Sequence, residues 1–192
     1  MFDGSNDYVN ITKTDLFDAF PYTIETWINP AKTNALQYIF GKGTDSAPGY
    51  NLTGLSVESN GGVRLFTLNT SNAAHLDATS AANVFLPGQW YHVVAVVQTS
   101  RADIYVNGVL VASDTTPTGT YKGPQAWNTA IGQYRPTAGG AFFQGAIDAF
   151  RIYSRALTSS EILSNYNNGN IEFQTRTSAD NSTWEAWKPV TG

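Results

Sequence analysis

The amino-acid sequence predicts an all-β protein, a two-sheet antiparallel sandwich with one short helix near its C-terminal end. Short runs rich in Val, Ile, Thr, Tyr, Phe and Trp recur along the chain, and clusters of Gly, Asn, Asp, Ser and Pro separate them. The 192 residues match the size of one such sandwich with a short appendage and are enough to bury a core. We therefore expect one main domain.

Two strands are indicated most clearly. Residues 90–98 are almost continuously apolar, which is typical of a central strand covered on both faces. Residues 22–29 alternate between two faces before Pro30, which lacks a backbone donor, ends the strand. Since Trp27 and Trp90 lie in these strands, we expect both in the core.

Asn and Gly residues mark where the chain turns. Asn107-Gly108 predicts a hairpin, because a type I′ turn needs positive φ at both central positions, and the Asn-Gly-Gly group at 60–62 predicts another. Residues 141–153 predict two final strands or one strand bent at Gly145. The strands expected beside the two turns are residues 50–56, 63–68, 103–106 and 109–112.

One helix has a clear start. Thr158 and Glu161 form a capping box, and Gly169 is placed to end the helix. A helix this short is marginal alone, so apolar side chains should dock it onto the sandwich. Those expected to do so are Leu157, Ile162, Leu163 and Tyr166.

The chain is expected to divide near residue 169. Residues 1–169 form the sandwich domain, and residues 170–192 change in texture to a strand, a turn and a second strand. We interpret this tail as a β-hairpin or as the start of a following module.

Composition excludes several classes of protein. The net charge is -4 without a basic cluster, so a nucleic-acid partner is not expected. There is no Cys, hence no disulfide or thiolate metal site. The longest apolar run, around residues 93–97, is far shorter than the roughly 20 residues of a membrane span. No export signal is recognisable, so we expect one outside these residues.

Four segments together resemble the laminin-G-like group of the concanavalin A-like lectin/glucanase superfamily. The resemblance implies a jelly-roll whose first and last strands lie side by side. It also implies an extracellular module, secreted or on a cell surface, within a larger multi-domain protein. The segments are FDGSNDYV at residues 2–9, IETWI at 24–28, WYHVV at 90–94 running to YVNG at 105–108, and FQGAIDAFRIYSRAL at 143–157.

The resemblance further implies a structural Ca²⁺ ion where the two ends of the domain meet. The matching carboxylates are Asp3 and Asp148, and Gly4 and Asp45 are further candidate ligands. Oxygen atoms of carboxylates and carbonyls are the ligands that Ca²⁺ requires. The alternative is that Asp3 caps the turn before Gly4 and Asp148 only accepts backbone hydrogen bonds.

Sugar binding needs exposed aromatic rings with amide, carboxylate or guanidinium groups beside them. For three of the candidate residues, an alternative to sugar binding stays open: Trp127 and Tyr134 would cover the core, and His75 would be solvated in a polar loop. His92, in the predicted central strand, is expected to be a hydrogen-bonded structural residue. The candidate ligand-binding residues are Tyr50, His75, Asp77, Tyr121, Trp127, Tyr134 and Arg135.

No catalytic pattern is found in the sequence. Retaining glycoside hydrolases of the resembled superfamily show a Glu-x-Asp-x-x-Glu strand, since their chemistry needs two carboxylates about 5 Å apart, whereas the glutamates here stand alone. We therefore expect a non-catalytic binding module for a polysaccharide or glycoconjugate. The alternative is an adhesion or spacer module that contacts a surface protein or neighbouring domains. A glycan-active enzyme is a third, less favoured hypothesis.

Overall fold

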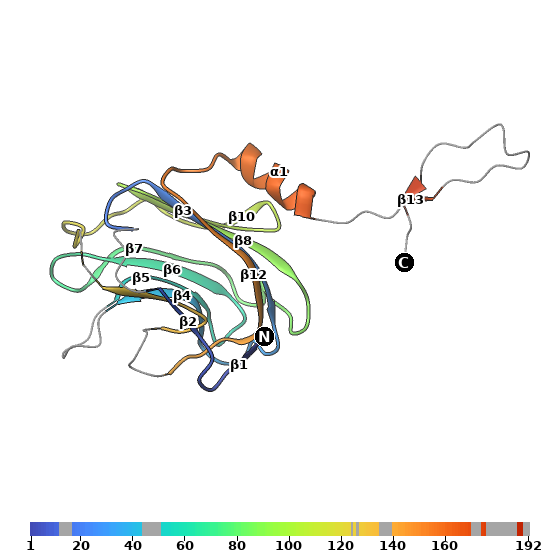
Figure 1. Ribbon diagram of the computed structural model, residues 1–192. Coiled ribbons are helices and arrows are strands. Elements are labelled where there is room, and N and C mark those ends of the chain that lie inside the picture. The colour runs from blue at the N-terminus through green and yellow to red at the C-terminus, as the bar shows by residue number, and fades with distance from the viewer. Residues whose placement is uncertain are drawn as a thin grey trace, which may run out of the picture.

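In the described part of the chain, two large antiparallel sheets form a sandwich with one helix on its outside (Figure 1). The computed structural model describes residues 1–11, 17–43, 51–123, 125, 127–134, 140–169, 174–175 and 188–189. Each large sheet has six strands. The predicted all-β jelly-roll sandwich with one short helix is confirmed.

Sheet A carries the helix on its outer side (Figure 1). Its first strand pairs with its last, Phe2 opposite Gly145, as the resemblance to the laminin-G-like group implied. Across the sheet, its strands are β1 (Phe2–Asp3), β12 (Gln144–Tyr153), β3 (Tyr22–Pro30), β8 (Tyr91–Gln98), β9 (Arg101–Val106) and β10 (Val109–Asp114).

Sheet B closes the other side of the core. β13 (Gln174–Thr175) pairs only with β14 (Lys188–Pro189), in a separate two-stranded sheet. The domain boundary at residue 169 stays a prediction. Across sheet B, the strands are β2 (Val9–Ile11), β11 (Asn128–Ile131), β4 (Gln37–Gly43), β5 (Asn51–Val57), β6 (Val63–Leu68) and β7 (Ala74–Thr79).

The predicted turns lie where they were expected. Asn107 and Gly108 have φ values of 51° and 78°, which suits the type I′ hairpin that joins β9 to β10. The final segment is a single strand, β12, and its irregularity lies at Ala149 rather than at Gly145. The register shifts between Asp148 and Arg151, and Ala149 has a φ of 48°.

Alternation along the strands separates the core from the outer face of sheet A. On β3, Ile24 and Ile28 are buried in the main core between the sheets. Side chains of successive residues point to opposite faces of a sheet, so Glu25 and Trp27 point to the outer side, toward the helix. A functional surface can therefore be built on this strand without disturbing the core.

Helix α1 (Ser159–Gly169) begins at the predicted capping box. The backbone N–H of Thr158 donates to the Glu161 carboxylate at 2.8 Å, and the N–H of Glu161 donates to Thr158 Oγ1 at 3.3 Å. Leu157 and Ile162 are buried in a small second core with Val94 and Val96 of β8.

One of the predicted docking side chains of α1 docks only in part. Leu163 is 48% exposed and lies against the β9–β10 turn at Gly108, at the edge of sheet A. Tyr166 does dock, through ring contacts with Trp27 and His92. The helix is therefore fixed at one flank by aliphatic packing and near its end by aromatic packing.

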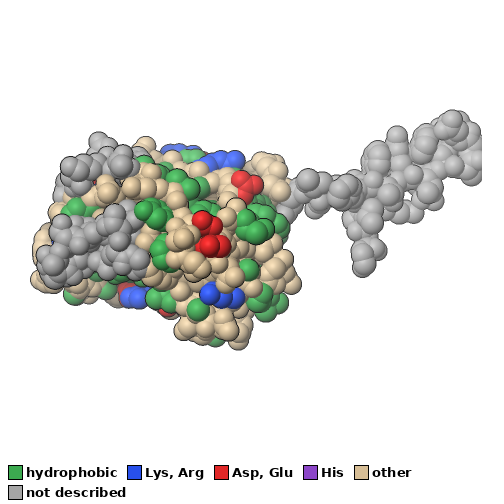
Figure 2. Space-filling model, turned by 60° about the horizontal axis from the view of Figure 1, so that its bottom comes forward, with side chains coloured by type: hydrophobic (Ala, Val, Ile, Leu, Met, Phe, Trp, Pro, Cys, Tyr) green, Lys and Arg blue, Asp and Glu red, His purple; other side chains and the backbone are tan. Residues whose placement is uncertain are grey.

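Charged side chains are sparse on the surface. The face in Figure 2 shows a few scattered acidic and basic side chains among hydrophobic and uncharged ones. In the part of the chain that the structure describes, no helix is long and apolar enough to cross a bilayer. The sequence contains 15 acidic and 11 basic residues, which agrees with the mixed character of this face.

Candidate functional site

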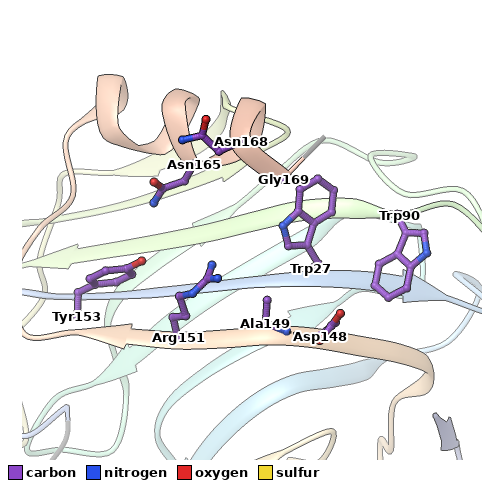
Figure 3. Close-up of a pocket in the computed structure, with 9 residues that line it drawn as sticks. All are labelled: Trp27, Trp90, Asp148, Ala149, Arg151, Tyr153, Asn165, Asn168 and Gly169. Atoms are coloured by element: carbon purple, nitrogen blue, oxygen red, sulfur yellow. Dashed lines mark hydrogen bonds between the residues drawn. The ribbon is translucent and has the colours of Figure 1, made fainter. Parts of the chain in front are cut away.

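The outer face of sheet A holds a groove beside helix α1, which we call the outer groove. It has a volume of about 670 Å³. In Figure 3, residues of α1 form one wall and residues of β12 form the other, with Trp27 and Trp90 at one end. The lining residues are Trp27, Trp90, Asp148, Ala149, Arg151, Tyr153, Asn165, Asn168 and Gly169.

Strand register sets the order of these side chains. Asp148 of β12 lies opposite Trp27 of β3, and Arg151 lies opposite Glu25. Trp27 in turn lies opposite His92 of β8. Residues of β12, β3 and β8 that face one another thus form rows across the sheet. The strand register fixes the order of the apolar, acidic and basic side chains along the groove.

Two tryptophans form the apolar part of the outer groove. The prediction that both lie in the core is therefore wrong. Trp90 is 48% exposed and precedes β8, so it is not in the core, and Trp27 is only half-buried. Trp27 points outward because the buried positions of β3 are the alternate ones. Among the described residues, the indole of Trp90 has no hydrogen-bond partner, so both its ring and its N–H are open to a ligand.

Trp27 is held in place from two sides. Its ring centroid lies 5.2 Å from that of His92 and 6.0 Å from that of Tyr166. Gly169 closes over the indole, and a Cβ at this position would come within 2.5 Å of the ring. Glycine is therefore needed for the end of α1 to approach Trp27 this closely.

A buried polar cluster lies beneath the outer groove. Glu25 Oε1 is 2.7 Å from His92 Nε2, and both side chains are 1% exposed. The hydroxyl of Tyr153 donates to Glu25 Oε2 at 2.5 Å, and the amide of Asn165 donates to the same oxygen at 3.3 Å. The expected structural role of His92 agrees with this geometry. The cluster joins β3, β8, β12 and α1 under the groove.

Hydrogen bonds decide the ionisation of Glu25. Burial would raise the pKa of Glu25, but the hydrogen bonds from His92 and Tyr153 outweigh it and hold the pKa below its usual value. Burial and the bond to Glu25 raise the pKa of Tyr153. Glu25 is thus an anion and Tyr153 a neutral donor at neutral pH, and the carboxylate is engaged by the protein itself.

The groove walls offer polar groups that the protein does not fully use. The side chain of Arg151 is 55% exposed, and its Nη1 lies 4.0 Å from Glu25 Oε2. Asp148 is exposed and uses Oδ1 to accept the backbone N–H of Ala149 at 2.7 Å. Asn168 is exposed on α1. Donors and acceptors beside aromatic rings are the combination that binds sugar hydroxyls and the apolar faces of sugar rings.

The two carboxylates of the predicted calcium site do not meet. Asp3 lies opposite Gln144 of β12, and Asp148 is four residues further, about 13 Å along the strand. Asp3 Oδ1 accepts the backbone N–H groups of Ser5 at 2.7 Å and Asn6 at 3.2 Å. This is the turn-capping geometry that the sequence left open as the alternative.

The remaining proposed calcium ligands add no further support. Gly4 follows Asp3 with a φ of 81°, and Asp45 lies outside the described residues. Within the described ranges, no three His, Asp or Glu side chains come together in a way that could hold a metal ion. The geometry therefore does not fit an ion shared by Asp3 and Asp148, and calcium stays a prediction.

Two of the predicted ligand-binding residues meet at the opposite end of β3. His75 and Tyr121 contact Phe20, with ring centroids 6.0 Å and 4.2 Å from it, and we call these three residues the end cluster. His75 lies in β7 and is 6% exposed, so the alternative of a solvated loop is wrong. The hydroxyl of Tyr121 donates to the carbonyl of Phe17 at 2.7 Å, and His75 Nδ1 lies 3.2 Å from the carbonyl of Thr118.

The other predicted ligand-binding residues are dispersed. Asp77 forms a two-pronged ion pair with Arg64, at 2.7 Å and 2.6 Å. Trp127 stacks under the ammonium of Lys122, 4.7 Å from its ring centre, and Tyr134 packs on Tyr38 at 4.5 Å. The structure does not gather them into one site. Tyr50 and Arg135 lie outside the described residues.

The outer groove was missed in the sequence, although one signal pointed to it. Ile24 and Ile28 mark the buried face of residues 22–29, so Glu25 and Trp27 were already known to share the other face. A buried carboxylate such as that of Glu25 needs hydrogen-bond partners. Those partners could not be identified from the sequence, because they depend on the pairing of β3 with β8 and β12.

Comparison with known proteins agrees with the fold. A family model of the laminin-G type, described as the concanavalin A-like lectin/glucanases superfamily, matches residues 3–163. Mouse pappalysin-1 is 29% identical over 99 residues, which are 52% of this chain and 6% of that protein. The chain thus spans a small part of the length of the curated relatives it matches.

Solved structures share the sandwich at low sequence identity. The NanB sialidase from Streptococcus pneumoniae superposes with a TM-score of 0.69 and 17% identity, covering 91% of this chain and 29% of that one. The CBM40 of the Ruminococcus gnavus IT-sialidase, solved with α2,3-sialyllactose, superposes with a TM-score of 0.63 and 16% identity, covering 85% and 100%. At these identities the superpositions establish the fold alone.

Proposed function

Because this chain belongs to the concanavalin A-like lectin/glucanases superfamily, we propose that it is a non-catalytic carbohydrate-binding module that holds its ligand in the outer groove. The observation that carries the proposal is the pairing of Trp27 and Trp90 with Asp148 and Arg151 in one open groove. Stacking on an indole selects the apolar face of a sugar ring, and the charged groups select its hydroxyls.

The engagement of Glu25 supports binding rather than catalysis. A glycosidase acid or nucleophile must reach the sugar, whereas the Glu25 carboxylate is 1% exposed and is bonded to His92, Tyr153 and Asn165. The carboxylate that the groove does present is Asp148. The proposal therefore assigns Glu25 a structural role and Asp148 a role in contacting the ligand.

The superfamily also bears on location and context. The CBM40 relative in fold was solved bound to a sialylated sugar and forms a module of a sialidase. We place this chain in the same broad class, an extracellular module within a longer protein, with polysaccharide or glycoconjugate as its partner. A glycan array, followed by affinity electrophoresis in polysaccharide gels, tests the sugar partner directly.

Substitution of Trp90 gives the sharpest test. Trp90→Ala removes an exposed ring, so the fold should survive while affinity for any retained glycan falls about tenfold or more. Trp127→Ala is the matched control, because Trp127 was also a predicted ligand residue but lies outside the groove. Equal retention of Trp90→Ala and the unsubstituted chain, with Trp127→Ala reduced, would move the site to the loops.

A protein partner is the second candidate function, and one surface favours it. Val109, Leu110 and Leu163 are 63%, 43% and 48% exposed, and Leu163 lies against the Asn107-Gly108 turn that leads into the other two. Apolar groups gathered on a surface commonly mark protein contacts. Silence on every glycan, together with self-association that Leu163→Asp abolishes in sedimentation experiments, would favour this function over sugar binding.

A further inference from the structure

A second groove continues the outer groove beyond Trp90. Its volume is about 910 Å³, and Trp90 is the residue that lines both grooves. The two grooves therefore border each other at one exposed indole. The lining residues of this second groove are Met1, Phe2, Asp3, Asn29, Ala31, Pro87, Gly88, Trp90, Gln144, Gly145 and Ala146.

Both grooves follow the same strand. Ala146 lies opposite Asn29 in the second groove, and Asp148 lies opposite Trp27 in the outer groove. Residues two apart on a strand share a face, so the lining continues along β12 from Ala146 to Tyr153. At about 3.3 Å per residue, this stretch is about 20 Å long. Figure 3 shows its outer-groove part, from Tyr153 past Arg151 and Asp148 to the two indoles.

We propose that the two grooves bind one linear, uncharged oligosaccharide along its length, with Trp90 stacking on a sugar ring in the middle of the chain. This inference rests on the proposed function and adds to it the shape and charge of the ligand. A surface of this length with a central exposed ring suits a run of sugar units, whereas a single terminal sugar would leave one groove empty.

The charges along the path argue against an acidic glycan. The exposed ionisable side chains are the carboxylates of Asp3 and Asp148 and the guanidinium of Arg151. Arg151 already faces the buried Glu25 carboxylate at 4.0 Å. A further cation, the α-ammonium of Met1, lines the second groove. The two exposed carboxylates repel uronates, sulfates and sialates, while neutral hydroxyls can donate to the carboxylate oxygens.

The experiment is a chain-length series measured by isothermal titration calorimetry. The neutral probes are the trimers and hexamers of β-1,4-glucose, β-1,3-glucose, β-1,4-xylose and β-1,4-mannose, and the acidic probes are hexagalacturonate and α2,3-sialyllactose. Ala146→Trp fills the second groove from a half-buried surface position, and Val109→Trp, at a 63% exposed position outside both grooves, is its control. Melting curves of both variants check that the sandwich still folds.

The expected result is that at least one neutral hexamer binds about tenfold or more tightly than its trimer. Ala146→Trp should remove that gain, while Val109→Trp should keep it. Hexagalacturonate should bind more weakly than the best neutral hexamer.

Three results would overturn the inference while leaving the proposed function in place. They are equal affinities for trimer and hexamer, a hexamer affinity that Ala146→Trp does not change, and tighter binding of an acidic probe. Binding of no sugar in any series, or binding that Trp90→Ala does not alter, would instead overturn the proposed function and the inference with it.

Discussion

The end cluster and the outer groove are both aromatic, yet the protein uses them differently. In the end cluster, the Tyr121 hydroxyl is bonded to a backbone carbonyl and His75 is 6% exposed. In the outer groove, Trp90 is 48% exposed, and its indole N–H has no partner among the described residues. An aromatic residue near the surface is thus most available to a ligand when the protein itself has engaged neither its polar atom nor its ring.

The same contrast holds between the floor of the outer groove and its walls. Glu25 is buried and engaged by its neighbours, and the buried His92 is paired to it through Nε2, while His92 Nδ1 has no hydrogen-bond partner among the described residues. Asp148 and Arg151, in contrast, keep unused hydrogen-bonding capacity at the surface. Floor residues should therefore control stability, and wall residues should control binding. Substitutions on the floor and on the walls test that division.

Replacement of Glu25 should have the largest effect on stability. Glu25→Ala leaves His92 and Tyr153 without their buried partner, so the free energy of unfolding should fall by about 3 kcal/mol in urea denaturation. Asp148→Ala is the control on the wall, and its change should stay within about 0.5 kcal/mol because Asp148 is exposed. Equal losses from the two variants would contradict the division between floor and walls.

Acid should weaken the groove floor next. The pKa of Glu25 in the folded protein is lowered from 4.5, so the folded state binds fewer protons than the unfolded state. The stabilisation from Glu25 is therefore complete above pH 4.5 and is lost as the pH falls through the lowered value. Urea denaturation at pH 7, 5 and 3 should show a larger loss for the unsubstituted chain than for Glu25→Gln. Parallel losses would assign the acid sensitivity to other carboxylates.

Tyr121→Phe tests the end cluster. It removes the hydrogen bond to the Phe17 carbonyl and should lower the free energy of unfolding by about 1 kcal/mol. Retention on glycan gels should not change, because the ring stays packed on Phe20. If retention fell as it is expected to fall for Trp90→Ala, the end cluster would also be a binding surface.

Calcium removal should give the smallest effect. Asp3 and Asp148 lie too far apart to share an ion, so Asp3→Asn and Asp148→Asn should melt with the same response to EDTA as the unsubstituted chain. An ion that binds only the folded state would raise the melting temperature. An EDTA-induced drop that disappears in both variants would restore the shared site that the resemblance implied.

The fold was predictable because its signals are local. The apolar run of β8, the Asn107-Gly108 turn and the capping box at Thr158 each depend on neighbouring residues alone. Other strands were missed because their sequences lack such signals. β4 contains two glycines, and β7 reads as polar, which is why His75 was placed in a loop.

The candidate site was not predictable in the same way, because it depends on pairing across the chain. Glu25 and His92 are 67 residues apart, and Glu25 and Asn165 are 140 apart. Trp90 was assigned to the core because it adjoins an apolar run, but β8 begins one residue later, at Tyr91. The resemblance correctly paired the first strand with the last, yet Asp3 and Asp148 occupy different rows of that pair.

The bulge at Ala149 is a position where the length of β12 can change without altering the packing of the core. Ile147 faces the core before the bulge and Phe150 faces it afterwards, so Ala149 is the one residue of β12 that the alternation does not need. It lines the outer groove between Asp148 and Arg151. Inserting a residue beside Ala149, or deleting Ala149, would shift Asp148 and Arg151 relative to each other while the inward-facing side chains kept their partners. A single-residue insertion or deletion in a strand can therefore reshape the outer groove without any loop being exchanged.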